Sequence, residues 1–373
     1  MKKFIPVNKP LIHKDDILSI SKTLKDGWVS AEGPNVSLFE NKFAKFIGHK
    51  YGITLANGTA ALEVAVQCLN LPKQSEVIIP NFTIFSNAIA CLKNDLKIKP
   101  VDCDIYDWNM NLQNIQKAIT NKTRLIIATH IYNYPLKMDI LKRICKKKNI
   151  YIIEDAAEVF GQKYKGKMCG SFGDLSTYSF YANKQITTGE GGMITTNSKE
   201  LSDKVKSLKN LSFGTNNRFN HDDISSNNRM SNINATLGLS QLGRIDQIIR
   251  KRHSVGKKYY DYLNKNKNLF IPNPVSKDSK NIYWVVAILI TNKNLNIDAA
   301  DVMKKLKKKG IGTRAFFWPM HKQKMLRKYN FFNSKSYVNS EYISKYGFYL
   351  PSSLSMSADE IKFISKCVNQ IIK

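Results

Sequence analysis

The feature that most constrains the fold is an alternation of strand-like and helix-like segments between residues 14 and about 210. Short apolar runs at 76–80, 124–130 and 151–153 are each followed by polar or helix-like sequence. This rhythm is typical of βαβ units, which place parallel strands in one sheet and helices on its faces. The sequence therefore predicts an α/β fold with a large, mainly parallel sheet.

The second half of the chain changes character. Residues 232–263 show helical spacing of apolar residues, and 271–281, with two prolines among polar residues, predict a join between domains. Beyond it we expect a strand, a helix, a second strand and a final amphipathic helix, at 282–290, 298–310, 311–318 and from Ala358. The predicted organisation is a large domain over residues 1–263, with an N-terminal segment and an interface helix, and a smaller C-terminal α/β domain over 264–373.

Net charge is the unusual part of the composition. The chain has 373 residues, enough for a large core, and 43% of them are hydrophobic, but its formal net charge is +29. Basic runs at 146–148 and 304–309 lie in helix-like segments without the interleaved aromatic residues of a base-stacking surface. We therefore predict solvated helix faces and no nucleic-acid partner, together with a positive field that draws anionic substrates.

Cysteine usage and hydropathy indicate the compartment. The six cysteines are scattered, with no CxxC pair and no His/Cys spacing typical of a metal site. The N-terminus breaks at Pro6 before an apolar signal-peptide core can form, and no apolar run approaches the roughly 20 residues that span a bilayer. We expect a cytoplasmic protein with reduced thiols, no metal and no membrane association.

Candidate chemistry gathers near two predicted strand ends. Lys184 follows a β-prone run and precedes TTGEGG at 187–192, where partial desolvation lowers the pKa of an amine and frees it as a nucleophile, as a Schiff-base lysine requires. Asp155 ends another strand-like run, so both side chains are expected at the carboxyl edge of one sheet. A carboxylate there can keep a pyridine nitrogen protonated, which makes pyridoxal 5′-phosphate (PLP) an electron sink.

A third element supplies a phosphate cradle. Residues 51–62 are predicted to form a strand, a tight turn at Asn57, Gly58 and Thr59, and the start of an Ala-rich helix, a layout that presents backbone amides to a phosphate. Each element alone is weak, because most lysines are solvated and many acidic residues after a strand cap a helix. Together the three predict a PLP site.

Five runs resemble, in order and spacing, the sugar aminotransferases of the DegT/DnrJ/EryC1/StrS family: NGTAAL, EDAAEVFG, GSFGD, SFYANKQITTGEGGM and NNRMSNINATLGLSQL. The resemblance extends from about Ile5 to the C-terminus and implies the fold type I architecture of PLP-dependent transferases. Residues 4–10, 27–33 and 313–323 are most similar to the GDP-perosamine synthase branch. Relatives with histidine at the lysine position are dehydratases, so Lys184 indicates amino transfer.

The resemblance implies roles for the cofactor residues. Lys184 would bind the cofactor aldehyde and then carry the proton between the substrate carbon and the cofactor, Asp155 would pair with the pyridinium nitrogen, and Glu158 would approach the ring hydroxyl. The phosphate would be held by Gly58, Thr59, Ser179 and the partner subunit's Asn227. For Ser179 an ordinary, satisfied strand hydroxyl is the alternative.

Asn227 carries the expectation about assembly. It lies in the polar stretch 214–228, which is predicted to be a long loop and resembles a family segment that crosses the dimer interface. The implied unit is a homodimer with shared active sites.

Three residues are candidates for binding substrate. Arg229 and Arg314 suit the substrate phosphate or the donor carboxylate, because guanidinium groups match both, although structural ion pairs are the alternative. His321 resembles the family's sugar-site histidine, and a buried, hydrogen-bonded core histidine is its alternative.

Several positions depart from the family pattern and leave the acceptor open. Ile84 stands where relatives often have an aromatic residue over the cofactor ring, and Phe85 should point to the other face if this segment is a strand. Asn228 replaces the usual aromatic residue after Asn227, and residues 133–134 replace a common Gly-containing pair. Pocket shape decides which ketone fits.

The first expectation is amino transfer from L-glutamate to the ketone of GDP-4-keto-6-deoxymannose, for surface polysaccharide biosynthesis. A UDP- or dTDP-linked keto-sugar, or a small phosphorylated ketose such as dihydroxyacetone phosphate, remains an alternative acceptor. A different class of function is a non-catalytic PLP-binding regulator or a basic nucleic-acid binder, which should lack a reactive lysine.

Overall fold

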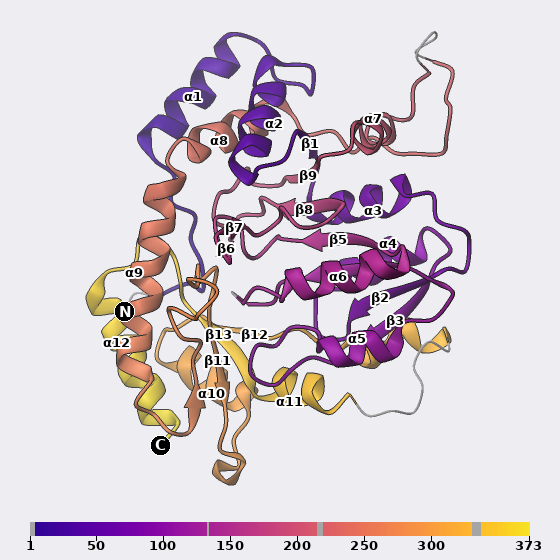
Figure 1. The fold of residues 1–373 in the computed structure, drawn as a ribbon. Helices are drawn as coiled ribbons and strands as arrows, with labels where there is room; N and C mark the ends of the chain where they lie inside the picture. The colour runs from indigo at the N-terminus through magenta and orange to yellow at the C-terminus, as the bar shows by residue number, and fades with distance from the viewer. Residues whose placement is uncertain (1–3, 133, 215–218, 330–336) are drawn as a thin grey trace.

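The computed structural model describes residues 4–132, 134–214, 219–329 and 337–373, and its centre is a seven-stranded sheet (Figure 1). In spatial order the strands are β1 (Tyr51–Leu55), β9 (Gly192–Thr196), β8 (Leu175–Ser179), β5 (Tyr151–Asp155), β4 (Thr123–Thr129), β2 (Glu76–Pro80) and β3 (Lys97–Val101). Strands β8, β5, β4, β2 and β3 are parallel, whereas β9 is antiparallel to both of its neighbours. The α/β architecture with a mainly parallel sheet is confirmed.

Both faces of this sheet are buried, as expected for apolar strands that lack a solvent-facing side. Ile126 and Ile152 face a core that includes side chains of α2 and α6, whereas Ile127 and Ile153 face a second core that includes α3, α4 and α7. The alternation follows the two-residue period of a strand. The helices around the sheet are α2 (Pro34–Ile47), α3 (Gly58–Cys68), α4 (Ser86–Leu92), α5 (Leu112–Ala118), α6 (Met138–Lys148) and α7 (Lys199–Leu208).

Two helices of the middle of the chain connect the large sheet to the C-terminal part. The helical stretch predicted at 232–263 forms α8 (Asn232–Leu242) and α9 (Ile245–Leu263), separated by a short break. Helix α8 packs against α1 (Lys14–Lys25) and α2, and α9 runs along the side of the molecule toward the C-terminal helix (Figure 1).

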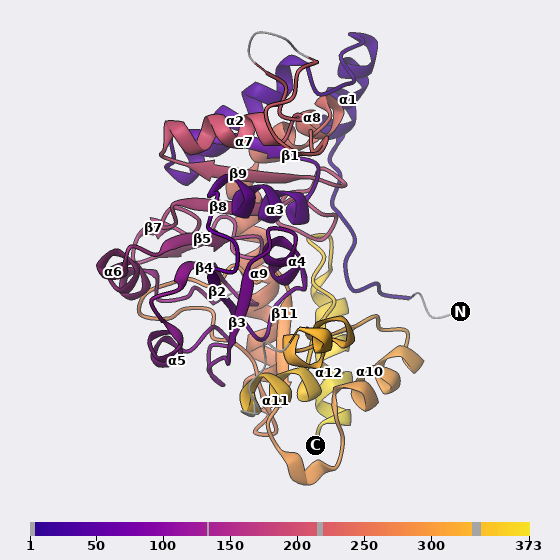
Figure 2. The same ribbon diagram turned by 90° about the vertical axis from the view of Figure 1, so that its right-hand side faces the viewer.

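The C-terminal part is built on a four-stranded antiparallel sheet. Its order is β10 (Leu269–Phe270), β11 (Val286–Ile290), β13 (Gly347–Leu350) and β12 (Arg314–Ala315). The helices that accompany this sheet are α10 (Ala299–Lys308), α11 (Val338–Tyr346) and α12 (Ala358–Ile371). Helices α10 and α11 lie near the lower edge in Figure 2. Short 3₁₀ helices cover Lys293–Leu295, Met320–Lys322 and Lys324–Lys328, and a two-stranded hairpin joins β6 (Lys163–Tyr164) to β7 (Lys167–Met168).

The two predicted C-terminal strands are shorter than expected. Of residues 282–290 only Val286–Ile290 pair as a strand, and of 311–318 only Arg314–Ala315 do. Aromatic residues of these two segments that lie outside the paired strands pack beside the large sheet. Trp284 and Phe316 belong to a buried cluster that also contains Tyr132, which follows β4.

Helix α9 contributes to two cores. Ile245 and Ile248 belong to a core of the large sheet, whereas Val255, Tyr259 and Leu263 belong to the core of the small one. The N-terminal segment likewise crosses over, since Ile5 pairs with Ile311. The boundary between residues 263 and 264 therefore stays a proposal.

All six cysteines are buried and unpaired. In the part of the chain that the structure describes, no helix combines the length and the apolar character that crossing a bilayer requires.

Candidate active site

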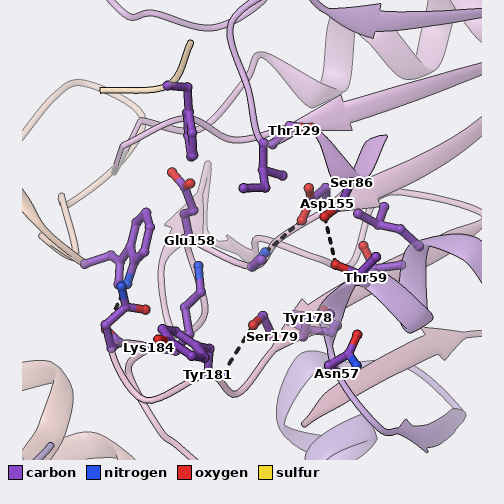
Figure 3. A pocket seen from close by; sticks show the side chains of 18 of the residues that line it. Asn57, Thr59, Ser86, Thr129, Asp155, Glu158, Tyr178, Ser179, Tyr181 and Lys184 are labelled. Carbon is purple, nitrogen blue, oxygen red and sulfur yellow. Dashed lines mark hydrogen bonds between the residues drawn. The ribbon is translucent and has the colours of Figure 1, made fainter. Parts of the chain in front are cut away.

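A cavity of about 700 Å³ lies at the carboxyl edge of the large sheet. Its lining includes Asn57, after β1, Asp155 at the end of β5, Ser179 at the end of β8, and Lys184. Figure 3 shows these side chains converging from separate segments. We refer to this space as the front cavity. Three of the predicted elements, the amine, the carboxylate and the helix turn, meet here.

Lys184 lies in a turn five positions beyond the end of β8, rather than at the strand end itself. The turn is fastened at its base, because Phe180 N donates to Gly191 O and Thr188 N donates to Phe180 O. Gly189 has a φ of 81°, a left-handed conformation that favours glycine. The TTGEGG signal therefore predicts a hydrogen-bonded return loop that holds the lysine over the sheet edge.

The Lys184 amine is surrounded by protein. Its side chain extends toward Glu158 (Figure 3), and its Nζ lies 3.6 Å from the centroid of the Trp284 ring. Burial lowers the pKa of Lys184, while the charges of Glu158 and Asp155 act in the opposite direction. A desolvated amine whose pKa is lowered is a better nucleophile at neutral pH.

Asp155 is buried at the end of β5. Its Oδ1 accepts a hydrogen bond of 3.2 Å from Ala157 N. Burial raises the pKa of Asp155, and that hydrogen bond together with the charges of Lys184 and His130 opposes the rise. The carboxyl group of Asp155 is thus held in place at the cavity wall by the amide of Ala157.

A buried pair of residues behind Asp155 was missed by the sequence reasoning. Glu154 Oε1 lies 2.8 Å from His130 Nε2, and neither side chain is exposed. Glu154 also accepts hydrogen bonds from the backbone amides of Gly170, Phe172 and Gly173. Two features of the sequence could have indicated this pair: the acidic Glu154 directly before Asp155, and the GSFGD run, whose backbone amides bind the Glu154 carboxylate. The pair fixes the strand end that carries Asp155.

Glu158 lies across the cavity from the lysine turn. Its Oε2 accepts a 2.6 Å hydrogen bond from Tyr132 N, and its backbone carbonyl accepts one of 2.7 Å from Gln185 Nε2. Burial raises the pKa of Glu158 to about 8, although the charge of Lys184 acts to lower it. The site therefore brings together a lysine and a carboxyl group whose charged forms are both disfavoured by burial.

The turn after β1 has the geometry of an anion cradle. Asn57 caps α3, because its Oδ1 accepts a 2.9 Å hydrogen bond from Ala60 N. The amides of Gly58 and Thr59, in the first turn of the helix, have no intrahelical acceptor. A Cβ at Gly58 would lie 2.8 Å from Ser179 Cβ, so the close approach of these two segments requires glycine. An anion at this helix N-terminus is favoured by the helix dipole.

Hydroxyl groups complete the cradle. Thr59 Oγ1 and Ser86 Oγ are 2.8 Å apart, and Ser179 Oγ accepts a 3.3 Å hydrogen bond from Tyr181 N. Thr177 Oγ1 is buried in the cavity wall and has no partner among the residues described. These groups fit a phosphorylated, nitrogen-containing ring such as PLP, which can satisfy the orphaned hydroxyl. Ser86 was not anticipated, because no local pattern links it to the Gly58 turn.

The predicted substrate residues are divided by the structure. Arg314 lines the front cavity from β12, where it pairs in register with Tyr349 of β13. Arg229 does not line it and instead donates to Asn210 Oδ1. Asn227 is exposed and also lies outside the lining, where its Oδ1 accepts a 3.3 Å hydrogen bond from Arg229 N. Both roles remain predictions: that of Arg229 concerns a bound substrate, and that of Asn227 concerns a second chain.

His321 lies outside the cavity lining. Its Nε2 is 2.9 Å from Glu341 Oε1, its Nδ1 is 2.9 Å from Asn81 Nδ2, and its ring stacks on Tyr337. This environment agrees with the alternative of a hydrogen-bonded, largely buried histidine, and a role at the sugar site stays a prediction.

One assumption about the departures from the family pattern was wrong. Residues 84 and 85 do not form a strand; Phe85 is the residue before α4 and packs against the core. Ile84 and Asn228 both line the front cavity, and Ile84 is 45% exposed. Both substituted positions therefore affect the shape of the pocket. Of the pair at 133–134, residue 133 lies outside the described residues.

Aromatic side chains that close the cavity come mainly from segments far apart in sequence. Tyr132, Trp284, Phe317 and Tyr349 line one wall, and the Tyr132 and Phe317 rings stack with centroids 5.0 Å apart. Tyr132 also has a left-handed φ of 45°, an uncommon conformation for a non-glycine residue. Sequence reasoning missed this wall because only the tertiary fold brings the segments together.

An amine, a buried carboxyl group and an anion cradle at one sheet edge are what a PLP-dependent transferase requires, and the fold belongs to that class. The described chain superimposes on Helicobacter pylori PseC, an aminotransferase involved in pseudoaminic acid biosynthesis, with a TM-score of 0.93, 23% identity and 99% coverage of both chains.

Sequence comparison identifies the family. The profile of the DegT/DnrJ/EryC1/StrS aminotransferase family matches residues 10–369. GDP-perosamine synthase from Escherichia coli O157:H7 is 36% identical over 369 residues, which cover 99% of this chain and 98% of that protein. GDP-perosamine synthase from Vibrio cholerae is 31% identical, with 98% of each chain covered. The chain belongs to the DegT/DnrJ/EryC1/StrS aminotransferase family and is a PLP-dependent aminotransferase.

Proposed function

We propose that this aminotransferase moves an amino group from L-glutamate to the ketone of a nucleotide-linked keto-sugar, with GDP-4-keto-6-deoxymannose as the first candidate. The observation that carries the proposal is the buried amine of Lys184, which shares the front cavity with Asp155 and Glu158. Support for the acceptor comes from the two similar GDP-perosamine synthases. A role in surface polysaccharide biosynthesis and a cytoplasmic location are parts of the same proposal.

Six residues of this chain would hold the cofactor. The backbone amides of Gly58 and Thr59 would donate to its phosphate. The hydroxyl groups of Thr59, Ser86 and Ser179 would complete the phosphate site. Asp155 would face the pyridine nitrogen, and Lys184 would bind the aldehyde group. When bound, PLP supplies the electron sink that stabilises negative charge at the substrate carbon.

Proton transfer falls to Lys184. Its Nζ would carry the proton between the substrate carbon and the cofactor within each half-reaction, which requires access to both protonation states near neutral pH. Burial lowers the pKa of Lys184 and makes the neutral amine available. The charges of Glu158 and Asp155 oppose that shift, and the face of Trp284, whose ring centroid is 3.6 Å from Nζ, also favours the protonated amine.

The mouth of the front cavity suits a phosphate-bearing acceptor and a carboxylate donor. Arg314 is exposed there and presents a guanidinium, which matches both anions. The formal net charge of +29 provides long-range attraction for such substrates. Aromatic residues along the wall exclude water from the reacting end.

A smaller acceptor is the second candidate. Ile84 occupies a lining position where an aromatic residue is common in the family, and Asn228 occupies another. Both substitutions change the shape of the acceptor side, which keeps UDP- or dTDP-linked keto-sugars and small phosphorylated ketoses such as dihydroxyacetone phosphate open.

The acceptor is tested by a substrate panel. Purified enzyme loaded with PLP is incubated with L-glutamate and each ketone in turn, and 2-oxoglutarate formation is measured together with the mass of the aminated product. Highest kcat/KM with GDP-4-keto-6-deoxymannose supports the proposal, and highest kcat/KM with another ketone replaces the acceptor. A protein that retains no borohydride-sensitive visible absorption band would instead match the non-catalytic alternative.

The proposed active unit is a homodimer in which the partner subunit's Asn227 reaches the cofactor phosphate. The exposure of Asn227 and its position outside this chain's own cavity support that arrangement. Mixing inactive Lys184→Ala chains with inactive Asn227→Asp chains should restore activity, since one of the two sites in each heterodimer regains both residues. Heterodimers that form but stay inactive would rule the shared site out.

A further inference from the structure

A second cavity lies on the other side of the Lys184 turn. It has a volume of about 160 Å³ and is bordered by the N-terminal segment, the turn, and helices α8 and α9, which meet at one side of the molecule (Figure 1). We refer to it as the rear cavity. Lys184 belongs to the lining of both cavities, so the turn is the wall between them.

The most buried charge in the rear cavity is that of Arg252. Its Nη1 donates to the carbonyls of Trp284 and Ser352 at 3.0 and 2.9 Å, and its Nη2 donates to that of Lys184 at 3.2 Å. Burial lowers the pKa of Arg252 to about 10, which leaves the guanidinium charged at neutral pH. Among the residues described, none of its partners is a carboxylate, and its Nε has no acceptor.

Gln241 presents a second unused donor. Its Oε1 accepts a 2.8 Å hydrogen bond from Thr187 N. Since a backbone amide can only donate, this bond fixes the orientation of the side-chain amide and turns Nε2 away from Thr187. Gln241 is 3% exposed, it lines the rear cavity, and its Nε2 has no acceptor in the described part of the chain.

The remaining lining has the same polarity. Asn8 Nδ2 is a third buried donor without a described acceptor. Lys9 and Lys251 also line the cavity, and no aspartate or glutamate is among the described residues that do. Arg244 also lines the cavity, but its charge is already paired, because its Nη2 lies 2.8 Å from Asp16 Oδ1. A buried charge with unused donors around it is costly unless a counter-charge satisfies them.

We propose that the rear cavity binds a small inorganic anion, such as chloride or phosphate, beside the side chains of Arg252 and Gln241. The volume equals that of roughly five water molecules in the liquid, which accommodates such an ion but not a large organic one. The bound anion compensates the charge of Arg252.

The anion also stabilises the turn that carries the amine. Arg252 is bonded to the carbonyl of Lys184, and Gln241 is bonded to the amide of Thr187, so both groups that hold the anion also hold the turn. This site is separate from the front cavity, and its occupancy does not depend on the identity of the acceptor.

The test compares anions at constant ionic strength. PLP-loaded protein, whose phosphate cradle is filled, is unfolded thermally while sodium gluconate is replaced stepwise by sodium chloride or phosphate. Gluconate is too large for the cavity, so general screening is unchanged while the small anion is added. We expect a saturable rise of about 2 °C in Tm. A second measurement soaks crystals of the same protein in bromide, with anomalous scattering expected between Arg252 and Gln241.

Gln241→Glu is the decisive variant. It is isosteric, it keeps an oxygen for Thr187 N, and it replaces the unused donor with a carboxylate that neutralises Arg252 from within. The anion-dependent rise in Tm should disappear. Gln113→Glu, which adds the same charge on α5 at an exposed position, should retain the rise.

Arg314→Gln is run alongside to remove anion binding at the front cavity, and it too should retain the rise. An equal rise in Gln241→Glu, no saturable rise in the unmodified protein, or bromide absent from the rear cavity would each overturn the proposal. The bromide result decides the matter if Gln241→Glu does not fold.

Discussion

The front and rear cavities differ in how they balance charge, although a single turn separates them. In the front cavity the Lys184 amine faces two buried carboxyl groups, Asp155 and Glu158, and all three have shifted pKa values. In the rear cavity Arg252 faces no carboxylate among the residues described. The front is thus suited to groups that exchange protons during a reaction, and the rear to a permanent charge that needs a fixed counter-ion.

The largest expected effect comes from removing the front amine. Lys184→Ala should keep the fold and lower turnover by about 10³-fold or more, because the residue provides both cofactor attachment and proton transfer. The measurement is turnover with glutamate, together with borohydride trapping and peptide mapping of the unmodified protein. Lys146→Ala on the exposed face of α6 is the matched control and should behave normally. A label on a lysine other than Lys184 would contradict the assignment.

The next effect comes from neutralising the buried carboxylate. Asp155→Asn should retain PLP but lose activity by about 10²-fold or more, because a neutral amide cannot keep the pyridine nitrogen protonated. Cofactor content is read from absorbance after dialysis, and turnover from 2-oxoglutarate release. Near-normal turnover in the loaded variant would show that Asp155 acts only as a structural residue at the end of β5.

Trp284 should have a smaller effect that is visible in the pH profile. Its ring stabilises the protonated form of Lys184, so Trp284→Leu should lower the pKa of the amine further and shift the alkaline side of the pH profile for kcat by about one unit toward acid. Trp284→Phe retains an aromatic face and should shift the profile less. Equal profiles in the two variants would indicate that the indole contributes only packing and its 2.9 Å hydrogen bond to Asn183 O.

The smallest effect concerns the stability of the cofactor-free protein. Folding raises the pKa of Glu158 from 4.5 to about 8, so the folded state holds this proton more tightly than the unfolded state does. The resulting stabilisation is complete below pH 4.5 and is lost as the pH rises through about 8. Glu158→Gln should therefore weaken the decrease in unfolding free energy between pH 5.5 and 8, measured by denaturant titration. An unchanged slope would show that Glu158 is ionised in the folded protein.

Sequence reasoning succeeded where the signal is local. The strand at 76–80 has the predicted bounds, and the apolar run at 151–153 begins the strand Tyr151–Asp155, because each is a short apolar run bounded by polar residues. The turn from β1 to α3 could be predicted because Asn57 and Gly58 have strong positional preferences at a helix start. The family motifs located Lys184 and Asp155 together.

What could not be predicted depends on contacts between distant segments. Trp284 reaches the front cavity only because residues 282–285 leave the small sheet, which no local pattern announces. The direction expected for Phe85 was conditional on a strand, whereas Phe85 is the residue before α4. The role proposed for Asn227 concerns a second chain, which the sequence of one chain does not describe.

Arg252 has a mechanical consequence for the whole molecule. Its guanidinium joins the lysine turn of the large sheet to two carbonyls, of Trp284 and Ser352, in the part that carries the small sheet. A rotation of one sheet relative to the other would break all three of these hydrogen bonds. The two sheets are therefore expected to move as a rigid body and to unfold in a single cooperative transition, which leaves access of substrates to the side chains and loops at the cavity mouth.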